Sequence, residues 1–118
     1  MYRSLDVYQR AKKIGMKIHQ KTKEFPAEER YEIGSQIRRA VVSIAVNIAE
    51  GYSRKVTVNE YRYFLRIATG STSEVRVLLE YCKEFGYMAE GEYEEYASEL
   101  EVISKQLYRL SETLKPVS

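Results

Sequence analysis

The chain has 118 residues, a length that suits one domain with its own hydrophobic core. Charged residues make up 31% of it, but the net charge is only +2, so total charge gives no argument for a nucleic-acid partner. The single cysteine, Cys82, excludes an internal disulfide and a thiolate metal cluster, and it favours a reducing, cytoplasmic setting. No secretory signal is expected, and the apolar run at 40–49 is too short to cross a membrane.

The first predicted helix runs from about Asp6 to about Lys23, and we expect either Ser4 or Asp6 to cap it. Apolar residues spaced three and four apart form its buried stripe. These residues are Val7, Ala11, Ile14 and Ile18.

A ridge of basic residues lies opposite this stripe, and no acid occurs between Asp6 and Glu24. Like charges three and four residues apart destabilise a helix, so a chain selected only for stability would intersperse acids. Two interpretations stay open: acids from another helix or subunit neutralise the ridge, or the ridge contacts the phosphates of RNA or DNA. We call these residues the basic ridge: Arg10, Lys13, Lys17 and Lys21.

The second predicted helix begins near residues 27–30, after the helix-breaking Pro26, and ends at Gly51 in the left-handed C-cap position. Apolar residues cover roughly two-thirds of its circumference, far more than the stripe of an ordinary surface helix. One small bundle covers one side of such a helix. We therefore expect a second copy of the chain to cover the other side.

The third predicted helix opens with a capping box at Thr57–Glu60 and ends near Phe85, where Gly86 stops it. It is also apolar around much of its circumference. Small residues at 69–73 form a waist, and we expect Gly70 to permit the close approach of another backbone.

The fourth predicted helix begins near Glu90–Tyr93 and ends near Leu114. It has one apolar stripe, with acids early and bases late, a distribution that suits the helix dipole. Three short connections between the four predicted helices indicate that consecutive helices are antiparallel neighbours.

The central stretch resembles the signature of a bacterial family, the four-helix-bundle proteins of the 23S rRNA intervening-sequence, or S23, type. Nearly the whole chain takes part, although a Trp is commoner in the family where this chain has Tyr8. The matching segments are Leu5-Asp6-Val7-Tyr8, Phe25-Pro26-Ala27-Glu28-Glu29, Gln36-Ile37-Arg38-Arg39-Ala40, Ser43-Ile44, Asn47-Ile48-Ala49-Glu50-Gly51 and Phe64-Leu65-Arg66-Ile67-Ala68-Thr69-Gly70-Ser71.

This resemblance implies a left-handed, up-down-up-down, all-α bundle that assembles as a ring, commonly a pentamer. A related branch, the accessory variability protein of diversity-generating retroelements, is similar in fold and binds nucleic acid and a reverse transcriptase. The resemblance implies no settled biochemical role for the intervening-sequence branch.

Glu74 interrupts an apolar flank of the third predicted helix, where a buried carboxylate has to be paired or protonated. Arg38 and Arg39 lie near the start of the other highly apolar helix. We expect one of them to form a structural bridge to Glu74, within or between subunits, in preference to a catalytic role for this carboxylate.

Other polar residues have structural interpretations that we prefer to functional ones. Glu50, near Arg54, is interpreted as an ion pair at the helix end rather than as a ligand-binding position. Ser43 and Asn47 are expected to form a hydrogen-bonded helix contact, because no base is available to activate Ser43. The only histidine, His19, is expected on the solvated surface.

The sequence shows no glycine loop for phosphates, zinc spacing, paired acids or hydrolase elbow, so we predict no catalytic residue, metal or cofactor. We predict one domain, 1–118, that forms a cyclic homo-oligomer and binds RNA or DNA electrostatically. A protein–protein adaptor, for an acidic partner such as a reverse transcriptase, is the alternative. An enzyme that uses Glu50 or Glu74 is less favoured. The predicted phosphate contacts are Arg10, Lys13, Lys17, Lys21, Arg54 and Lys55.

Overall fold

The computed structural model describes residues 1–54 and 57–114, and these residues form helices and turns without a strand. Four long helices make the bundle, which confirms the predicted all-α, four-helix architecture. They are α1 (Asp6–Thr22), α3 (Ile33–Ser53), α4 (Val58–Glu84) and α5 (Glu90–Thr113). A 3-10 turn, η1 (Tyr2–Ser4), precedes α1, and the short α2 (Ala27–Tyr31) lies between α1 and α3.

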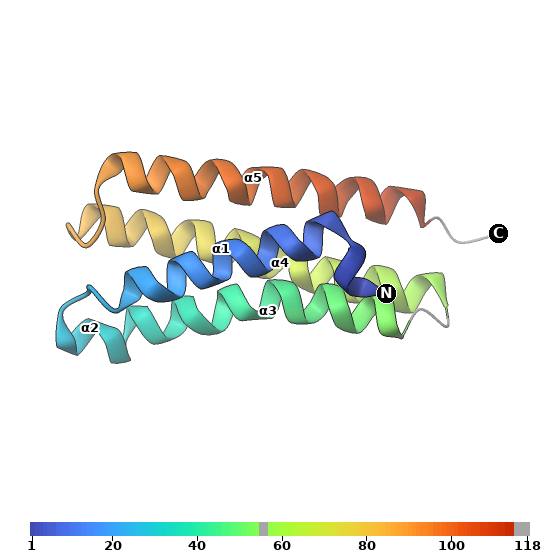
Figure 1. The fold of residues 1–118 in the computed structure, drawn as a ribbon, viewed down its shortest axis with the longest axis horizontal. Coiled ribbons are helices and arrows are strands. Elements are labelled where there is room, and N and C mark those ends of the chain that lie inside the picture. The colour runs from blue at the N-terminus through green and yellow to red at the C-terminus, as the bar shows by residue number, and fades with distance from the viewer. Residues whose placement is uncertain (55–56, 115–118) are drawn as a thin grey trace.

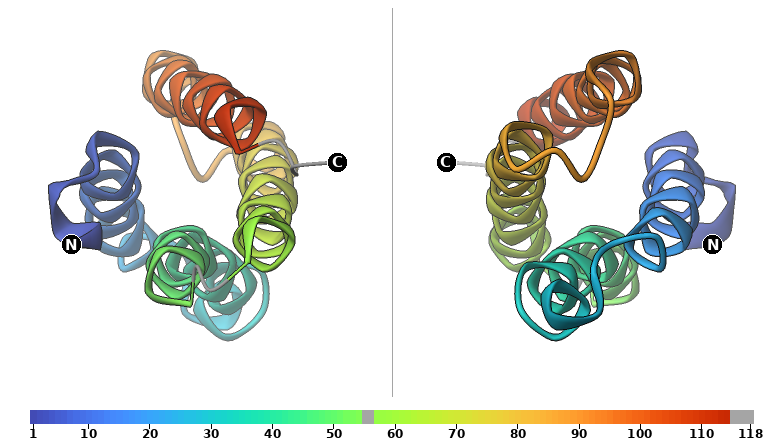
Figure 2. Two further views of the ribbon diagram at one scale, coloured as in Figure 1. Left: turned by 90° about the vertical axis from the view of Figure 1, so that its right-hand side faces the viewer. Right: turned by 90° about the vertical axis from the view of Figure 1, so that its left-hand side faces the viewer.

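Consecutive long helices run in opposite directions along a bundle of 51 × 23 × 22 Å (Figure 1). Seen from its ends, the bundle places α3 and α4 between α1 and α5 (Figure 2). The contact between α3 and α4 is the most extensive, and the contact between α1 and α5 is much thinner. None of the described helices combines the length and apolar character needed to cross a membrane.

The core consists of the apolar stripes of the four long helices, because residues three and four apart lie on one face of a helix. All four stripes predicted from the sequence point inward. The largest fully buried side chains on the long helices are Ile18, Ile37, Ile44, Ile48, Leu65, Leu79, Leu100, Ile103 and Leu107.

The predicted second helix is in fact two helices, α2 and α3. Glu32 separates them, with φ −100° and ψ −103°, outside the helical region. The turn before α2 buries Phe25 in the core, with its ring centroid 5.4 Å from that of Tyr87. Gly34, just after the break, permits the chain to fold back, because a Cβ there would lie 3.0 Å from the carbonyl oxygen of Glu29.

Gly51 lies inside α3 and does not end it, which corrects the predicted C-cap. The helix continues to Ser53. A Cβ at Gly51 would lie 2.9 Å from Phe64 Cβ and 3.1 Å from Tyr61 Cδ1, so α3 and α4 need glycine here for their close approach. The left-handed residue is the predicted Gly86, with φ 83°, which follows α4.

The predicted caps have mixed outcomes. Thr57 caps α4 as predicted, because its hydroxyl oxygen accepts a hydrogen bond from the backbone N–H of Glu60 at 3.0 Å. Neither Ser4 nor Asp6 caps α1. The N-cap residue is Leu5, Asp6 is already helical, and the Ser4 hydroxyl donates to the Met1 carbonyl oxygen at 2.7 Å.

The substitution Gly51→Ala is expected to lower the free energy of unfolding by about 1–3 kcal/mol, because its methyl group overpacks the α3–α4 contact. Gly91→Ala in α5 is the matched control, since no heavy atom lies within 4 Å of the added Cβ. The control is expected to leave stability unchanged or to raise it by up to about 1 kcal/mol. Urea denaturation measures both effects, and an equal loss in the two variants would contradict this account of Gly51.

Candidate nucleic-acid interface

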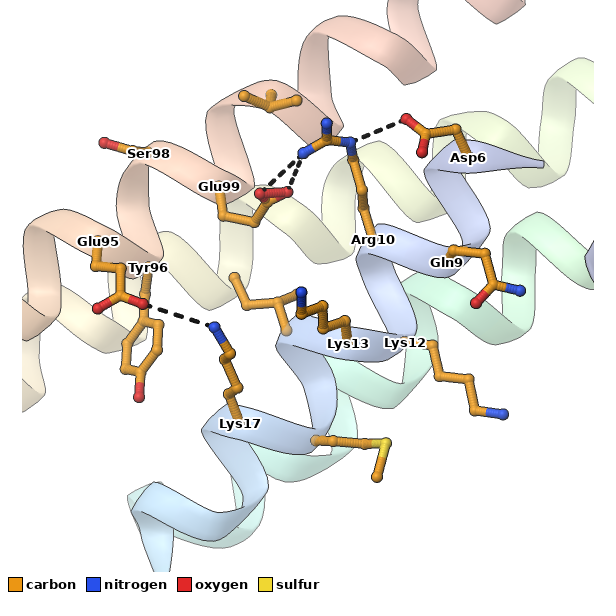
Figure 3. A pocket seen from close by; sticks show the side chains of 13 residues that line it. Asp6, Gln9, Arg10, Lys12, Lys13, Lys17, Glu95, Tyr96, Ser98 and Glu99 are labelled. Carbon is orange, nitrogen blue, oxygen red and sulfur yellow. Dashed lines mark hydrogen bonds and ion pairs between the residues drawn. The ribbon is translucent and has the colours of Figure 1, made fainter. Parts of the chain in front are cut away.

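The basic ridge of α1 faces α5, where acids meet it. Arg10 lies between two carboxylates: its Nη1 is 2.7 Å from Glu99 Oε1, and its Nε is 2.9 Å from Asp6 Oδ2 (Figure 3). Hydrogen bonds to Glu99 and then to Asp6 raise the pKa of Arg10. Hydrogen bonds from Gln106 and then from Arg10 lower the pKa of Asp6.

Lys21 and Lys17 extend this contact along α1. Lys21 Nζ lies 2.9 Å from Glu92 Oε1 of α5 and 3.2 Å from Glu24 Oε1, and its side chain is only 12% exposed. The hydrogen bond to Glu92 raises the pKa of Lys21. Lys17 Nζ is 3.7 Å from Glu95 Oε1, and both side chains are at least half exposed, so this pair is weak.

Lys13 and Lys12 are the exposed lysines of α1 for which the described residues provide no ion pair. Both line a groove of about 800 Å³ between α1 and α5, and the Lys12 side chain extends away from Glu95 and Glu99 (Figure 3). The groove also has an apolar part. That part is formed by Ile14, Met16, Tyr96 and Val102.

The structure therefore supports the first interpretation of the ridge for three of its four residues: α5 acids neutralise Arg10, Lys17 and Lys21. Lys13 keeps its charge exposed. Phosphate contact through the ridge stays a prediction, and the sequence pattern did not single out Lys12 as the second exposed charge. Lys12 lies on a neighbouring flank of α1, so the spacing that defines the ridge leaves it out.

The α3–α4 connection holds the other two predicted contacts. Arg54 Nε lies 3.2 Å from Glu50 Oε1, which confirms the predicted ion pair at the end of α3. Lys55 lies outside the described residues. Glu50 is thus engaged with a cation one turn away.

Glu74 is exposed rather than buried, which corrects the premise of the predicted bridge. Within the chain it accepts a hydrogen bond from Gln36 Nε2 at 3.4 Å. Arg38 points instead toward α1, where it donates to Thr22 Oγ1 at 3.1 Å. Arg39 is exposed. A bridge from Arg39 to Glu74 between subunits stays a prediction.

The polar contact predicted at Ser43 and Asn47 is confirmed. Ser43 Oγ lies 2.8 Å from Ser71 Oγ of α4, and Asn47 Nδ2 donates to Ser43 Oγ at 2.9 Å. Cys82 is fully buried, and burial raises the pKa of its thiol to about 11, so the thiol stays protonated at neutral pH. His19 is exposed, as predicted.

The sequence pattern did not single out the most exposed aromatic residue, Tyr31, which is 85% exposed at the end of α2. The sequence predicted one continuous helix through this position, whereas the helix breaks at Glu32, directly after Tyr31.

In the described part of the chain, no group of three or more His, Cys, Asp and Glu residues is arranged to hold a metal ion. The fold and this surface define a class: a four-helix-bundle protein whose first and last helices are joined by a network of charges. Residues 3–109 match the model of the 23S rRNA-intervening sequence protein family, and the chain belongs to that family.

A similar solved structure is that of a protein of unknown function from the S23 ribosomal protein family of Bacteroides thetaiotaomicron VPI-5482. The two chains are 22% identical, the match covers 89% of this chain and 97% of the other, and the TM-score is 0.82. This likeness shows the shared fold. No curated protein matches the chain. The relation to the accessory variability protein stays a prediction.

A double-mutant cycle of Lys21→Gln and Glu92→Gln is expected to give a coupling energy of about 0.5–1 kcal/mol at neutral pH, since the pair is short and Lys21 is largely buried. The pKa of Lys21 is raised on folding, so this stabilisation is fully present below the ordinary value of 10.5 and is lost as the pH rises through the raised value. The matched pair Lys17 and Glu95 is expected to show almost no coupling. Urea denaturation at several pH values measures both cycles, and equal coupling energies would contradict the prediction.

Proposed function

We propose that this chain is a non-enzymatic binding protein that assembles into a cyclic homo-oligomer, with five subunits as the family resemblance implies, and binds RNA or DNA electrostatically. The observation that supports the proposal best is the apolar character of the outer faces of α3 and α4. Several large apolar side chains on these faces are exposed in the single chain. Contiguous exposed apolar patches mark protein interaction sites.

The outer face of α4 has a coiled-coil pattern. Six positions alternate in steps of four and three residues, an average period of 3.5, which is the period of a helix seam that packs against another helix. The only glycine of α4 lies in this seam, and a Cβ added there would have no heavy atom within 4 Å, so a neighbouring helix has room to approach. The α4 seam is Tyr63, Ile67, Gly70, Glu74, Val77 and Tyr81.

The outer face of α3 has a similar pattern with steps of three and four residues. Val42 and Val46 lie at its middle, and each is 54% exposed. Side chains this apolar gain about 1.5–3 kcal/mol when they are moved from full exposure to full burial. The α3 seam is Arg39, Val42, Val46, Ala49 and Ser53.

Contact between the α3 seam of one subunit and the α4 seam of the next is heterologous, and a heterologous contact generates a ring when the rotation closes. Rotation about a ring axis parallel to the helices leaves the position of each residue along that axis unchanged. Gln36 is hydrogen-bonded to Glu74 within the chain, so Arg39 of the neighbouring subunit would lie within about one helical turn of that position. An Arg39–Glu74 bridge between subunits would then fix the register of the interface.

In this assembly α1 and α5 lie outside the proposed contact, and the charges of α1 repeat around the ring. Lys13 and the weakly paired Lys17 would neutralise phosphates, with Lys55 of the predicted set adding to the charge. Arg10, Lys21 and Arg54 are already paired with acids and would contribute less. Each single patch would bind weakly. Repetition would raise the overall affinity through multivalency.

An adaptor for an acidic protein, such as a reverse transcriptase, is the second candidate, and the apolar part of the α1–α5 groove favours it. A protein partner would bury Met16 and Val102, whereas phosphates would not touch them. Loss of partner binding in Met16→Asp, with RNA and DNA binding unchanged, would support the adaptor. The reverse result would support the nucleic-acid interface.

The substitution Val46→Asp is expected to shift the protein from the ring to a folded monomer, because it places a charge in the middle of the α3 seam. Val102→Asp on α5 is the matched control, since this valine is also exposed but lies outside both seams, and it is expected to leave the mass unchanged. Light scattering at micromolar concentration measures the mass, and circular dichroism checks the fold. A monomeric wild-type protein would refute the proposed assembly.

The substitution Lys13→Glu, alone and combined with Lys17→Glu, is expected to weaken RNA and DNA binding by about tenfold or more in the assembled protein. Because fewer phosphates are neutralised, the plot of log affinity against log salt should lose a slope of about 0.7–0.9 for each contact removed. Lys105→Glu on α5 is the control, since it reverses an exposed charge away from the ridge. Unchanged affinity in the Lys13 and Lys17 variants would sink the phosphate hypothesis.

A further inference from the structure

A second cluster of positive charge lies at the end of the bundle where α1, α2 and α3 meet. It surrounds a pocket of about 200 Å³, which we call the end pocket. Cationic and polar side chains line it almost entirely, and none of its lining residues is an acid. The lining residues are His19, Thr22, Lys23, Arg30, Tyr31 and Arg38.

Two arginines of the end pocket are held in place by neutral oxygens. Arg38 Nη2 donates to the carbonyl oxygen of Arg30 at 2.8 Å, and Arg38 Nη1 donates to the buried Thr22 Oγ1 at 3.1 Å. Arg30 Nε donates to the carbonyl oxygen of Phe25 at 3.1 Å. Each guanidinium has five N–H donors, so both keep donors for a ligand while their positions are fixed.

No carboxylate offsets these charges within the described residues: His19, Lys23, Arg30 and Arg38 take part in none of the ion pairs found there. The acids nearest in sequence are engaged elsewhere or lie outside the pocket lining. Glu24 pairs with Lys21, and Glu29 lies beside Tyr87, whose pKa is raised first by burial and then by Glu29. Glu28 also acts on Tyr87, and Glu32 is exposed at the break between α2 and α3.

This arrangement differs from the basic ridge, where α5 acids neutralise three of the four cations. Several cations that are fixed near one another without a counter-ion repel each other, and an oxyanion bound among them removes that repulsion. Planar guanidinium groups match the oxygens of a phosphate by paired hydrogen bonds. The ring of Tyr31, the most exposed of the large apolar side chains, lies at the same pocket and offers a free face on which a base can stack.

We propose that the end pocket binds the phosphate group of a nucleotide or of a nucleic-acid strand, with the adjoining base stacked on Tyr31. The cations Lys23, Arg30 and Arg38 contact the phosphate oxygens, and His19 lies at the rim. This site is separate from the basic ridge and does not depend on the formation of a ring.

Titration of the labelled full-length protein with inorganic phosphate, AMP, adenosine and a short single-stranded RNA, followed by amide NMR shifts, tests the site. Phosphate and AMP are expected to shift the amides around Lys23, Arg30 and Tyr31, and adenosine is expected to have little effect. Tighter binding of AMP than of phosphate shows stacking, and tighter binding of the RNA than of AMP identifies a strand as the source of the phosphate. Saturation by AMP alone identifies a free nucleotide.

Lys23, Arg30 and Tyr31 are exposed, so we expect substitutions there to preserve the fold. Lys23→Gln is expected to lower the affinity for both phosphate and AMP by about tenfold, because it removes a charge-assisted hydrogen bond. Tyr31→Ala is expected to lower the affinity for AMP by about tenfold and to leave the affinity for inorganic phosphate unchanged. Arg30→Gln, with its fold checked by circular dichroism, is expected to lower the affinity for both phosphate and AMP.

Lys12→Gln is the matched control, because it removes an exposed α1 charge outside the end pocket, and its AMP affinity is expected to equal that of the wild type. Lys13→Glu separates the two proposals, since it is expected to weaken RNA binding at the basic ridge but to leave AMP binding at the end pocket unchanged. The end pocket would be refuted if phosphate and AMP shifted no amides there at millimolar concentrations. An equal effect of Lys12→Gln and Lys23→Gln would refute it as well.

Discussion

The close approach of α3 and α4 is the constraint on which the rest of the bundle depends. Gly51 brings the α3 backbone against Phe64 and Tyr61, and farther along the pair Ser43 shares a hydrogen bond with Ser71. Two helices that approach this closely turn their small and polar residues toward each other. Their larger apolar residues are then divided between the core and the outer faces. In the single chain α3 therefore exposes valines, and α4 exposes a valine and two tyrosines.

On the opposite side of the bundle, ion pairs supplement the apolar contact between α1 and α5. Their apolar contact is thin, and ion pairs from Arg10, Lys17 and Lys21 to α5 acids lie along it. The basic helix α1 and the acidic N-terminal half of α5 thus attract each other where few apolar contacts join the two helices. Among the cations of α1 and of its junction with α2 and α3, those without an acid are open to a ligand. They are Lys12 and Lys13, which line the α1–α5 groove, and the cations of the end pocket.

Most of the fold followed from periodicity and capping residues. The ends of α1, α4 and α5 lie within a residue or two of the predictions, because Thr57, Gly86 and the apolar stripes specify them locally. The break at Glu32 could not be predicted in this way. Gly34 follows two residues later, but a lone glycine inside an apolar helical pattern does not by itself specify a break. The turn before α2 buries Phe25 in the core.

The sequence by itself determined four amphipathic helices, two of them apolar around much of their circumference, and a first helix without acids after Asp6. Only the tertiary structure decided which cations are neutralised, because ion pairs join residues such as Lys21 and Glu92 that lie far apart in the chain. It also decided that Glu74 is exposed and that Arg38 faces α1, since the side of a helix that meets its neighbour depends on how the helices pack. The helical period gives the angles between side chains around one helix. Packing decides how that helix is rotated about its axis, and therefore which side chains face a neighbouring helix.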